Sequence, residues 1–232
     1  MNIWVAFGAL SIGVIIWFLL VRRLNTRSWE RLGSRMHVRD SRGDIGEVTV
    51  PPARIALWVF LGVITSLFGL FISAYFIRMG HGHGAGISDW HPVSKPPILW
   101  FNTAMLVLSS AAMQAARRAV GLNQRARVMG YLFAGGAFAI LFLSGQLLAW
   151  HQLRDSGYGL TSGPAGAFFY VLTGVHGLHL LGGLLVWLKT VARMRSRAVP
   201  LIEVRLSIQL CTVYWHFLLL VWLVMFALLL ST

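Results

Sequence analysis

Six long apolar runs divide the chain, and they constrain its fold more than any other feature of the sequence. A helix that crosses a bilayer needs about 20 predominantly apolar residues. Strands with open edges would leave backbone groups unpaired in lipid, so each run is predicted to form a helix. The runs cover residues 3–21, 55–77, 97–116, 128–150, 164–188 and 206–230. We therefore expect an all-α, polytopic membrane protein with six transmembrane helices.

The charged residues agree with this interpretation. Only 12% of the residues are charged, and none of the seven acidic residues falls in the middle of an apolar run. A formal net charge of +13 would suggest a nucleic-acid-binding protein if the chain were soluble. The arginines, however, cluster beside the apolar runs, which is typical of membrane flanks. We expect no nucleic-acid partner.

The distribution of lysine and arginine predicts the orientation of the helices. Residues 22–54, 117–127 and 189–205 hold eight, four and five of these basic residues, whereas residues 78–95 and 151–163 hold two and one. Basic loops face the cytoplasm. The prediction is therefore a multi-pass protein of the bacterial inner (plasma) membrane, with both termini outside.

Three segments are expected. Residues 1–22 form an N-terminal transmembrane anchor, residues 23–53 a basic cytoplasmic linker, and residues 54–232 a five-helix membrane domain. The first run lacks a basic segment before it and is followed by Arg22 and Arg23, so a retained anchor is favoured over a signal peptide. The linker could bind anionic lipid headgroups or be simply solvated, and both readings stay open.

Two predicted helices carry polar residues at membrane depth. The stretch FFYVLTGVHGLHLLGG, residues 168–183, places His176 and His179 three residues apart. Ionisable residues in a membrane usually face protein or water. Two such histidines could help to bind a metal, but no carboxylate or thiolate joins them on that helix. Hydrogen bonding to neighbouring helices is therefore the favoured interpretation.

A matching stripe lies in the last predicted helix, where Gln209, Thr212 and His216 fall on one face. Thr173 and His176 form a similar stripe on the helix before it. Facing polar stripes suggest interhelical hydrogen bonds, worth about 0.6 kcal/mol each. That role is structural rather than catalytic.

These motifs resemble a known family. HGLH at residues 176–179, together with YWHF at residues 214–217, resembles subunit III of cytochrome c oxidases of the haem-copper type. Asn102 and Thr103 with Ser109 and Ser110, and further on Gln146, resemble other positions of that family. The likeness runs from about residue 55 to the C-terminus. The predicted structural polar set is Thr173, His176, His179, Gln209, Thr212, His216, Trp215 and Gln146.

The resemblance implies a non-redox subunit of a proton-pumping cytochrome c oxidase in aerobic respiration. This chain would have no catalytic, cofactor or metal residues of its own, and haem and copper would be held by partner subunits. The implied partners are catalytic subunit I, other oxidase subunits, phospholipids, and a cytochrome c that gives electrons to the complex. A respiratory supercomplex is left open. Lys189 and Arg193 are candidate lipid-binding residues, because the family has a basic phosphate contact past the HGLH helix.

The sequence also departs from the family pattern. The positions where the family usually has intramembrane carboxylates correspond here to Ile64, Ala149, Gln209 and Leu219. We therefore expect no carbodiimide-reactive carboxylate inside the membrane, and no proton conduction through this chain.

Two alternatives remain. The chain could be the equivalent subunit of a quinol oxidase or of a nitric oxide reductase. An ion-coupled transporter is less favoured, because an intramembrane carboxylate or a broken helix pair would be expected. His81, His83 and His91 stand in a glycine-rich segment that could bind a divalent metal or be a plain polar loop.

Overall fold

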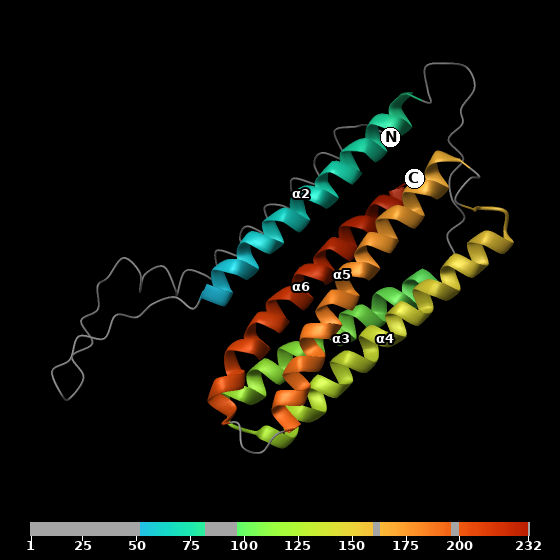
Figure 1. Ribbon diagram of the computed structural model, residues 1–232. Coiled ribbons are helices and arrows are strands. Elements are labelled where there is room, and N and C mark those ends of the chain that lie inside the picture. Colours follow the sequence, from blue (N-terminus) through green and yellow to red (C-terminus); the bar gives the residue numbers. More distant parts are fainter. Residues whose placement is uncertain (1–51, 82–96, 160–162, 196–199, 232) are drawn as a thin grey trace. The chain divides into compact units, whose positions relative to one another are not determined.

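The computed structural model describes residues 52–81, 97–159, 163–195 and 200–231 (Figure 1). The helices within these ranges are α2 (Pro52–His81), α3 (Ile98–Gly121), α4 (Arg125–Asp155), α5 (Pro164–Arg195) and α6 (Leu201–Ser231). By length and composition, all five could cross a membrane. The described residues contain no strand, so the all-α prediction is confirmed for them.

Five of the six predicted helices are therefore present. The helix predicted over residues 3–21, the basic linker, and His83 and His91 lie outside the described residues. The chain divides into two compact units, residues 1–56 and 57–232, and the second contains α3–α6 and most of α2. All contacts below lie within that second unit.

The helices extend beyond the apolar runs that predicted them. α5, for example, continues past residue 188 to Arg195 and carries basic residues in its last turn. An apolar run marks only the part of a helix inside hydrocarbon, about 30 Å. Backbone hydrogen bonding continues into the polar interface, where charged side chains are solvated.

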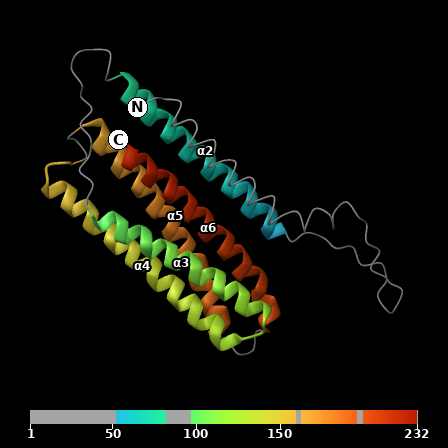
Figure 2. The same ribbon diagram turned by 180° about the vertical axis from the view of Figure 1, so that it is seen from behind.

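α3 and α4 form a tight antiparallel pair. Between them the amide of Gln124 donates to the carbonyl of Ala119 at 3.1 Å, and Asn123 has a φ of 54°. Asparagine is one of the few non-glycine residues that adopts this left-handed conformation readily. α6 packs against both α3 and α5, and α4 also contacts α5. Figures 1 and 2 show α3 beside α4 from both sides.

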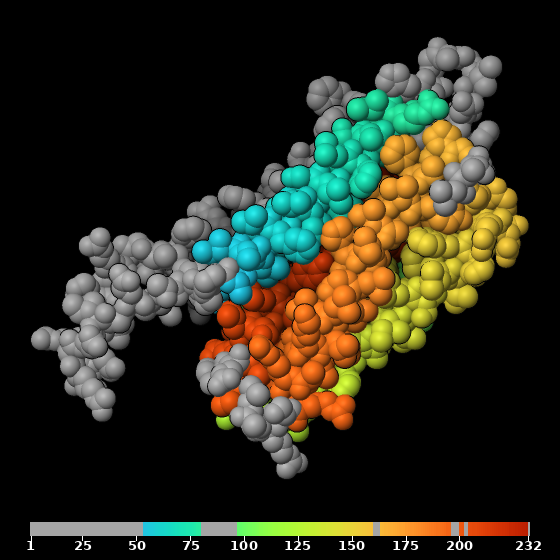
Figure 3. Space-filling view, viewed as in Figure 1, coloured from blue at the N-terminus to red at the C-terminus, as the bar shows by residue number. Residues whose placement is uncertain are grey.

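α2 presents one apolar stripe to the other helices. Its buried residues recur every three or four positions, as in a helix with one packed face: Leu61, Ile64, Phe68, Ile72 and Tyr75. Phe68 meets the ring of His179 at 5.8 Å, and Tyr75 meets Phe168 at 5.6 Å, both on α5. The space-filling view shows α2 side chains against α5 (Figure 3). Ile64, at a position where the family usually has glutamate, therefore lies inside the protein.

Candidate functional site

Polar side chains gather inside the helical unit, although most of the interior is apolar. Among the residues that the structure describes, eight buried polar residues come from α3, α4, α5 and α6: Asn102, Ser109, Ser110, Gln146, Thr173, His176, Thr190 and Thr212. A buried polar group costs free energy unless it is hydrogen-bonded. Their partners therefore decide what this interior can do.

Ser109 of α3 connects three helices. The indole Nε1 of Trp215, on α6, donates to Ser109 Oγ at 2.8 Å. The same hydroxyl donates to the carbonyl of Gly135, on α4, at 2.7 Å. Ser109 accepts one hydrogen bond and donates another, so its hydroxyl joins α6 to α4. Trp215 is 0% exposed, which makes this link part of the core.

The polar stripe of α6 faces α3. His216 hydrogen-bonds through Nδ1 to the Ser110 hydroxyl and through Nε2 to Gln114 Oε1, the latter at 3.1 Å. Thr212 Oγ1 lies 3.2 Å from the Met113 carbonyl and 2.8 Å from the carbonyl of Ile208 on its own helix. The stripe was expected to face Thr173 and His176 on α5. Thr212 and His216 bond to α3 instead, because α6 packs between α3 and α5.

Thr173 is paired with α4 rather than with α6. Its hydroxyl accepts from the indole Nε1 of Trp150 at 3.0 Å and donates to the carbonyl of Phe169 at 2.7 Å. Two further indoles join helices in the same way. Trp187 donates to the carbonyl of Leu132, and Trp222 donates to Thr103 Oγ1, each at 3.0 Å. Sequence reasoning missed these links, since an indole in an apolar run gives no sign of its partner.

His176 has an environment that the sequence did not predict. It is 0% exposed, and among the described residues neither of its ring nitrogens has a hydrogen-bond partner. Its neighbours are the rings of Trp222 at 5.4 Å, Phe142 at 5.7 Å and Phe68 at 6.5 Å. The interpretation that His176 hydrogen-bonds to another helix is therefore wrong. Aromatic rings from three helices enclose it.

His179 is held differently. Its Nδ1 donates to the carbonyl of Val175, on its own helix, at 2.7 Å, and its carbonyl accepts from the Tyr214 hydroxyl at 2.9 Å. Within the described residues, no three histidines, cysteines or carboxylates come together as a metal site would need. Aromatic rings enclose His176, so it does not fit as one member of an axial pair for haem.

Gln146 lies opposite Asn102, and their amides meet at 3.4 Å. The Asn102 Oδ1 atom fills the space beside Gly145, where a built Cβ would lie 2.0 Å away. A larger residue at position 145 would displace the Asn102 side chain from this close approach between α3 and α4. Small residues have this role in many membrane helix pairs.

The two candidate lipid-binding residues lie at one end of α5. Lys189 and Arg193 are both exposed in its last two turns. Nearby, Arg125 of α4 donates through Nη2 to the carbonyl of Met194 at 2.7 Å. Cationic side chains thus surround the C-terminal end of α5, where the helix dipole also favours positive charge.

Comparison with known proteins agrees with this architecture. Residues 55–231 match the family model for cytochrome c oxidase subunit III. The chain is 31% identical over 174 residues to cytochrome c oxidase subunit 3 of Synechocystis sp., covering 73% of this chain and 68% of that protein. It is 26% identical to cytochrome bo(3) ubiquinol oxidase subunit 3 of Pseudomonas putida, covering 79% and 85%.

A third relative has both subunit I and subunit III in its name. The haem-copper oxidase subunit I+III of Aeropyrum pernix is 27% identical over 183 residues, which cover 75% of this chain and 22% of that protein. The region that matches the family model includes all of α3–α6 and most of α2, and with it the HGLH and YWHF motifs. This chain belongs to the cytochrome c oxidase subunit III family.

Proposed function

We propose that this chain is the non-redox subunit III of a proton-pumping cytochrome c oxidase, where it supports the stability and lipid binding of the catalytic core. The match to the family model over residues 55–231 carries the proposal. The interior polar groups support a non-redox role, because Ser109, Thr212 and His216 form hydrogen bonds between helices. Haem and copper are assigned to partner subunits, and a cytochrome c is the proposed electron donor to the complex.

A quinol oxidase is the second candidate. It is favoured by the similarity to the Pseudomonas putida relative, whose name specifies a ubiquinol oxidase. Membership of an oxidase subunit family makes an ion-coupled transporter the weaker hypothesis. The predicted orientation, with both termini outside the inner membrane, and a supercomplex partner remain part of the proposal.

Purification through a tag on this chain tests the proposed assembly. We expect a subunit I homologue to copurify and the complex to show a haem spectrum, whereas the chain expressed alone should carry no stoichiometric haem. Oxidation of reduced cytochrome c, against oxidation of a quinol, distinguishes the two candidates. His176→Ala should weaken assembly yet leave the haem spectrum unchanged, because His176 is enclosed by rings of this chain. Stoichiometric haem in the isolated chain would contradict the proposal.

Arg193 is proposed to hold a phospholipid phosphate, with Lys189 beside it. Arg193 stands fourteen residues after His179, which is about 20 Å along the helix axis and near the headgroup level. A guanidinium can donate two parallel hydrogen bonds to a phosphate. Arg193→Ala should therefore lower the phospholipid that copurifies with the complex, measured as phosphorus per haem.

The same variant should shorten the life of the enzyme during turnover and leave its initial rate nearly unchanged, since no redox group is touched. Arg127→Ala is the control, because Arg127 is also exposed near that end of the bundle and donates to Gln124 Oε1 at 3.0 Å. Equal lipid content in wild type and Arg193→Ala would leave Arg193 only a role in orientation.

A further inference from the structure

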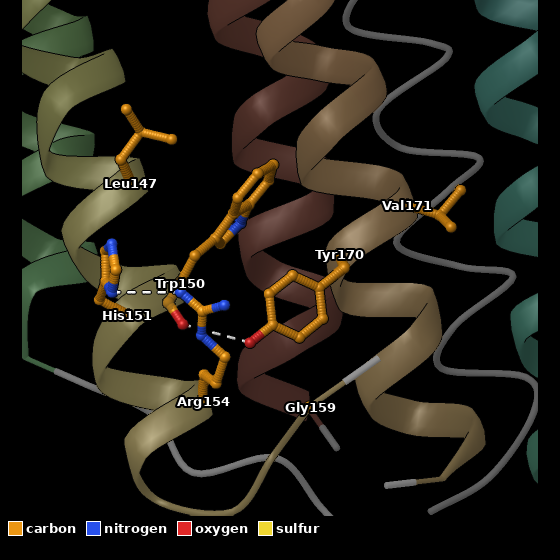
Figure 4. Close-up of a pocket in the computed structure, with 7 residues that line it drawn as sticks. All are labelled: Leu147, Trp150, His151, Arg154, Gly159, Tyr170 and Val171. Carbon is orange, nitrogen blue, oxygen red and sulfur yellow. Dashed lines mark hydrogen bonds between the residues drawn. The ribbon is translucent and has the colours of Figure 1, made fainter. Parts of the chain in front are cut away.

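A pocket lies between α4 and α5 at the end of the helices away from Arg193. It has a volume of about 560 Å³ and is lined by Leu147, Trp150, His151, Arg154, Gly159, Tyr170 and Val171. This volume falls within the range of small-molecule sites, roughly 300–1,000 Å³. Figure 4 shows the guanidinium of Arg154 between the rings of His151 and Tyr170.

The guanidinium of Arg154, the cationic group of the pocket, has N–H donors that are not used within the described part of the protein. Arg154 donates from Nη2 to His151 Nδ1 at 3.4 Å, and it forms no ion pair with a carboxylate in the described part of the chain. Since Nδ1 of the imidazole accepts, its ring proton is on Nε2, which is a further donor. A guanidinium has five N–H donors, so most of those on Arg154 are left for a ligand. The site suits an anion.

Hydrogen bonds hold the wall of the pocket in place. The Tyr170 hydroxyl, on α5, lies 3.2 Å from the carbonyl of Trp150 and 3.0 Å from the carbonyl of Tyr158. Trp150 is in turn fixed by the bond from its indole to Thr173. These bonds tie the end of α4 and the residues after it to α5, so the space beside Arg154 is preformed.

The depth of the pocket spans the boundary between headgroups and acyl chains. α4 has 31 residues, and at 1.5 Å per residue it is about 46 Å long, against a hydrocarbon thickness of about 30 Å. Arg154 stands in its last turn, beyond the hydrocarbon. Leu147 lies two turns deeper, about 10 Å along the axis, and is 57% exposed. A ligand here would meet a cation at one end and an apolar surface at the other.

We propose that this pocket binds an anionic phospholipid, with its phosphate on Arg154 and His151 and its acyl chain beside Leu147. The occupant follows from the charge of Arg154 together with the change of lining with depth. A free anion would need only the charge, and a protein partner would not need this change from polar to apolar lining. The site is distinct from Arg193, because Tyr170 and Arg193 stand about 35 Å apart along α5. The two arginines would therefore contact lipids of opposite leaflets. The proposal does not depend on the function assigned above.

Native mass spectrometry of the detergent-purified full-length chain tests this inference, with phosphatidylglycerol as the probe. Wild type should retain one more phosphatidylglycerol than Arg154→Gln, and the variant's affinity at that site should be roughly tenfold lower, as expected for loss of a hydrogen-bonded charge. Leu147→Trp leaves the charge in place and fills the pocket, so it should also weaken binding. Both residues are exposed, and neither change disturbs the core.

Arg78→Gln is the matched control, because Arg78 is exposed near the corresponding end of α2 and does not line the pocket. Equal lipid loss in Arg78→Gln and Arg154→Gln would overturn the proposal. Loss in Arg154→Gln without loss in Leu147→Trp would place the lipid outside the pocket. Displacement of phosphatidylglycerol by millimolar inorganic phosphate would identify a free-anion site instead, and this too would overturn it.

Discussion

Replacing Gly136 by alanine is expected to destabilise the packing of α4 on α5 by about 2 kcal/mol or more, the cost of overpacking a tight interior. A Cβ at this position would lie 2.3 Å from Cζ2 of Trp187 and 2.6 Å from Cη2. The indole is rigid and nearly buried, and its Nε1 donates to the carbonyl of Leu132 on α4. The ring cannot move aside without breaking that bond.

Gly130 supplies the control on the same helix. A Cβ there would meet nothing within 4 Å, so Gly130→Ala should stabilise α4 by up to about 1 kcal/mol through the higher helix propensity of alanine. Unfolding of the purified chain by sodium dodecyl sulfate, followed by circular dichroism, measures both changes. Equal stability of the two variants would show that the Trp187 ring moves aside easily, and it would contradict the predicted clash with a Cβ at position 136.

Trp215→Ala should have a still larger effect, a loss of about 3–5 kcal/mol. Trp215 is fully buried, and the change would remove its bond to Ser109 along with the whole ring. Together with the nearer Tyr214, the ring also fills the space beside Gly183 on α5, where a built Cβ would lie 3.3 Å from Cζ3 of Trp215. In a membrane the packing between helices supplies much of the stability, so the cavity would weaken α6 against both α3 and α5.

One further variant separates packing from hydrogen bonding in that measurement, and another controls for burial. Trp215→Phe keeps most of the ring but loses the indole donor, and it should cost less than the alanine change. Trp100→Ala removes an indole that is 62% exposed, and its effect should be small although the ring touches Phe226. The assay is the same detergent unfolding. An effect of Trp215→Ala no larger than that of Trp100→Ala would contradict the buried placement.

The five described helices could be predicted from the sequence, because a span of hydrocarbon forces both length and apolar composition on each of them. The ends could be predicted less well. Basic residues such as Arg193 continue the helix into the interface, where hydropathy no longer marks it. The polar face of α6 was also predictable from the spacing of Thr212 and His216.

Which helix that face meets was not predictable. Spacing along one helix defines a face but not its neighbour, and in the structure the neighbour of Thr212 and His216 is α3, with partners 99 and 106 residues earlier in the chain. For the same reason the sequence could not show that His176 lacks a hydrogen-bond partner. The pocket at Arg154 arises from two helices, and only the fold brings Tyr170 beside it.

The pairing of α3 with both α4 and α6 has a consequence for the order of assembly. α4 follows α3 directly in the chain, so this pair can close as soon as both have entered the membrane. α6 follows the other described helices in the chain, so before it is inserted Ser110 and Gln114 lack their partner His216, and Ser109 lacks its indole donor. A nascent chain therefore carries an open polar seam along α3 through much of its synthesis. Packing of α6 on α3 then closes this seam.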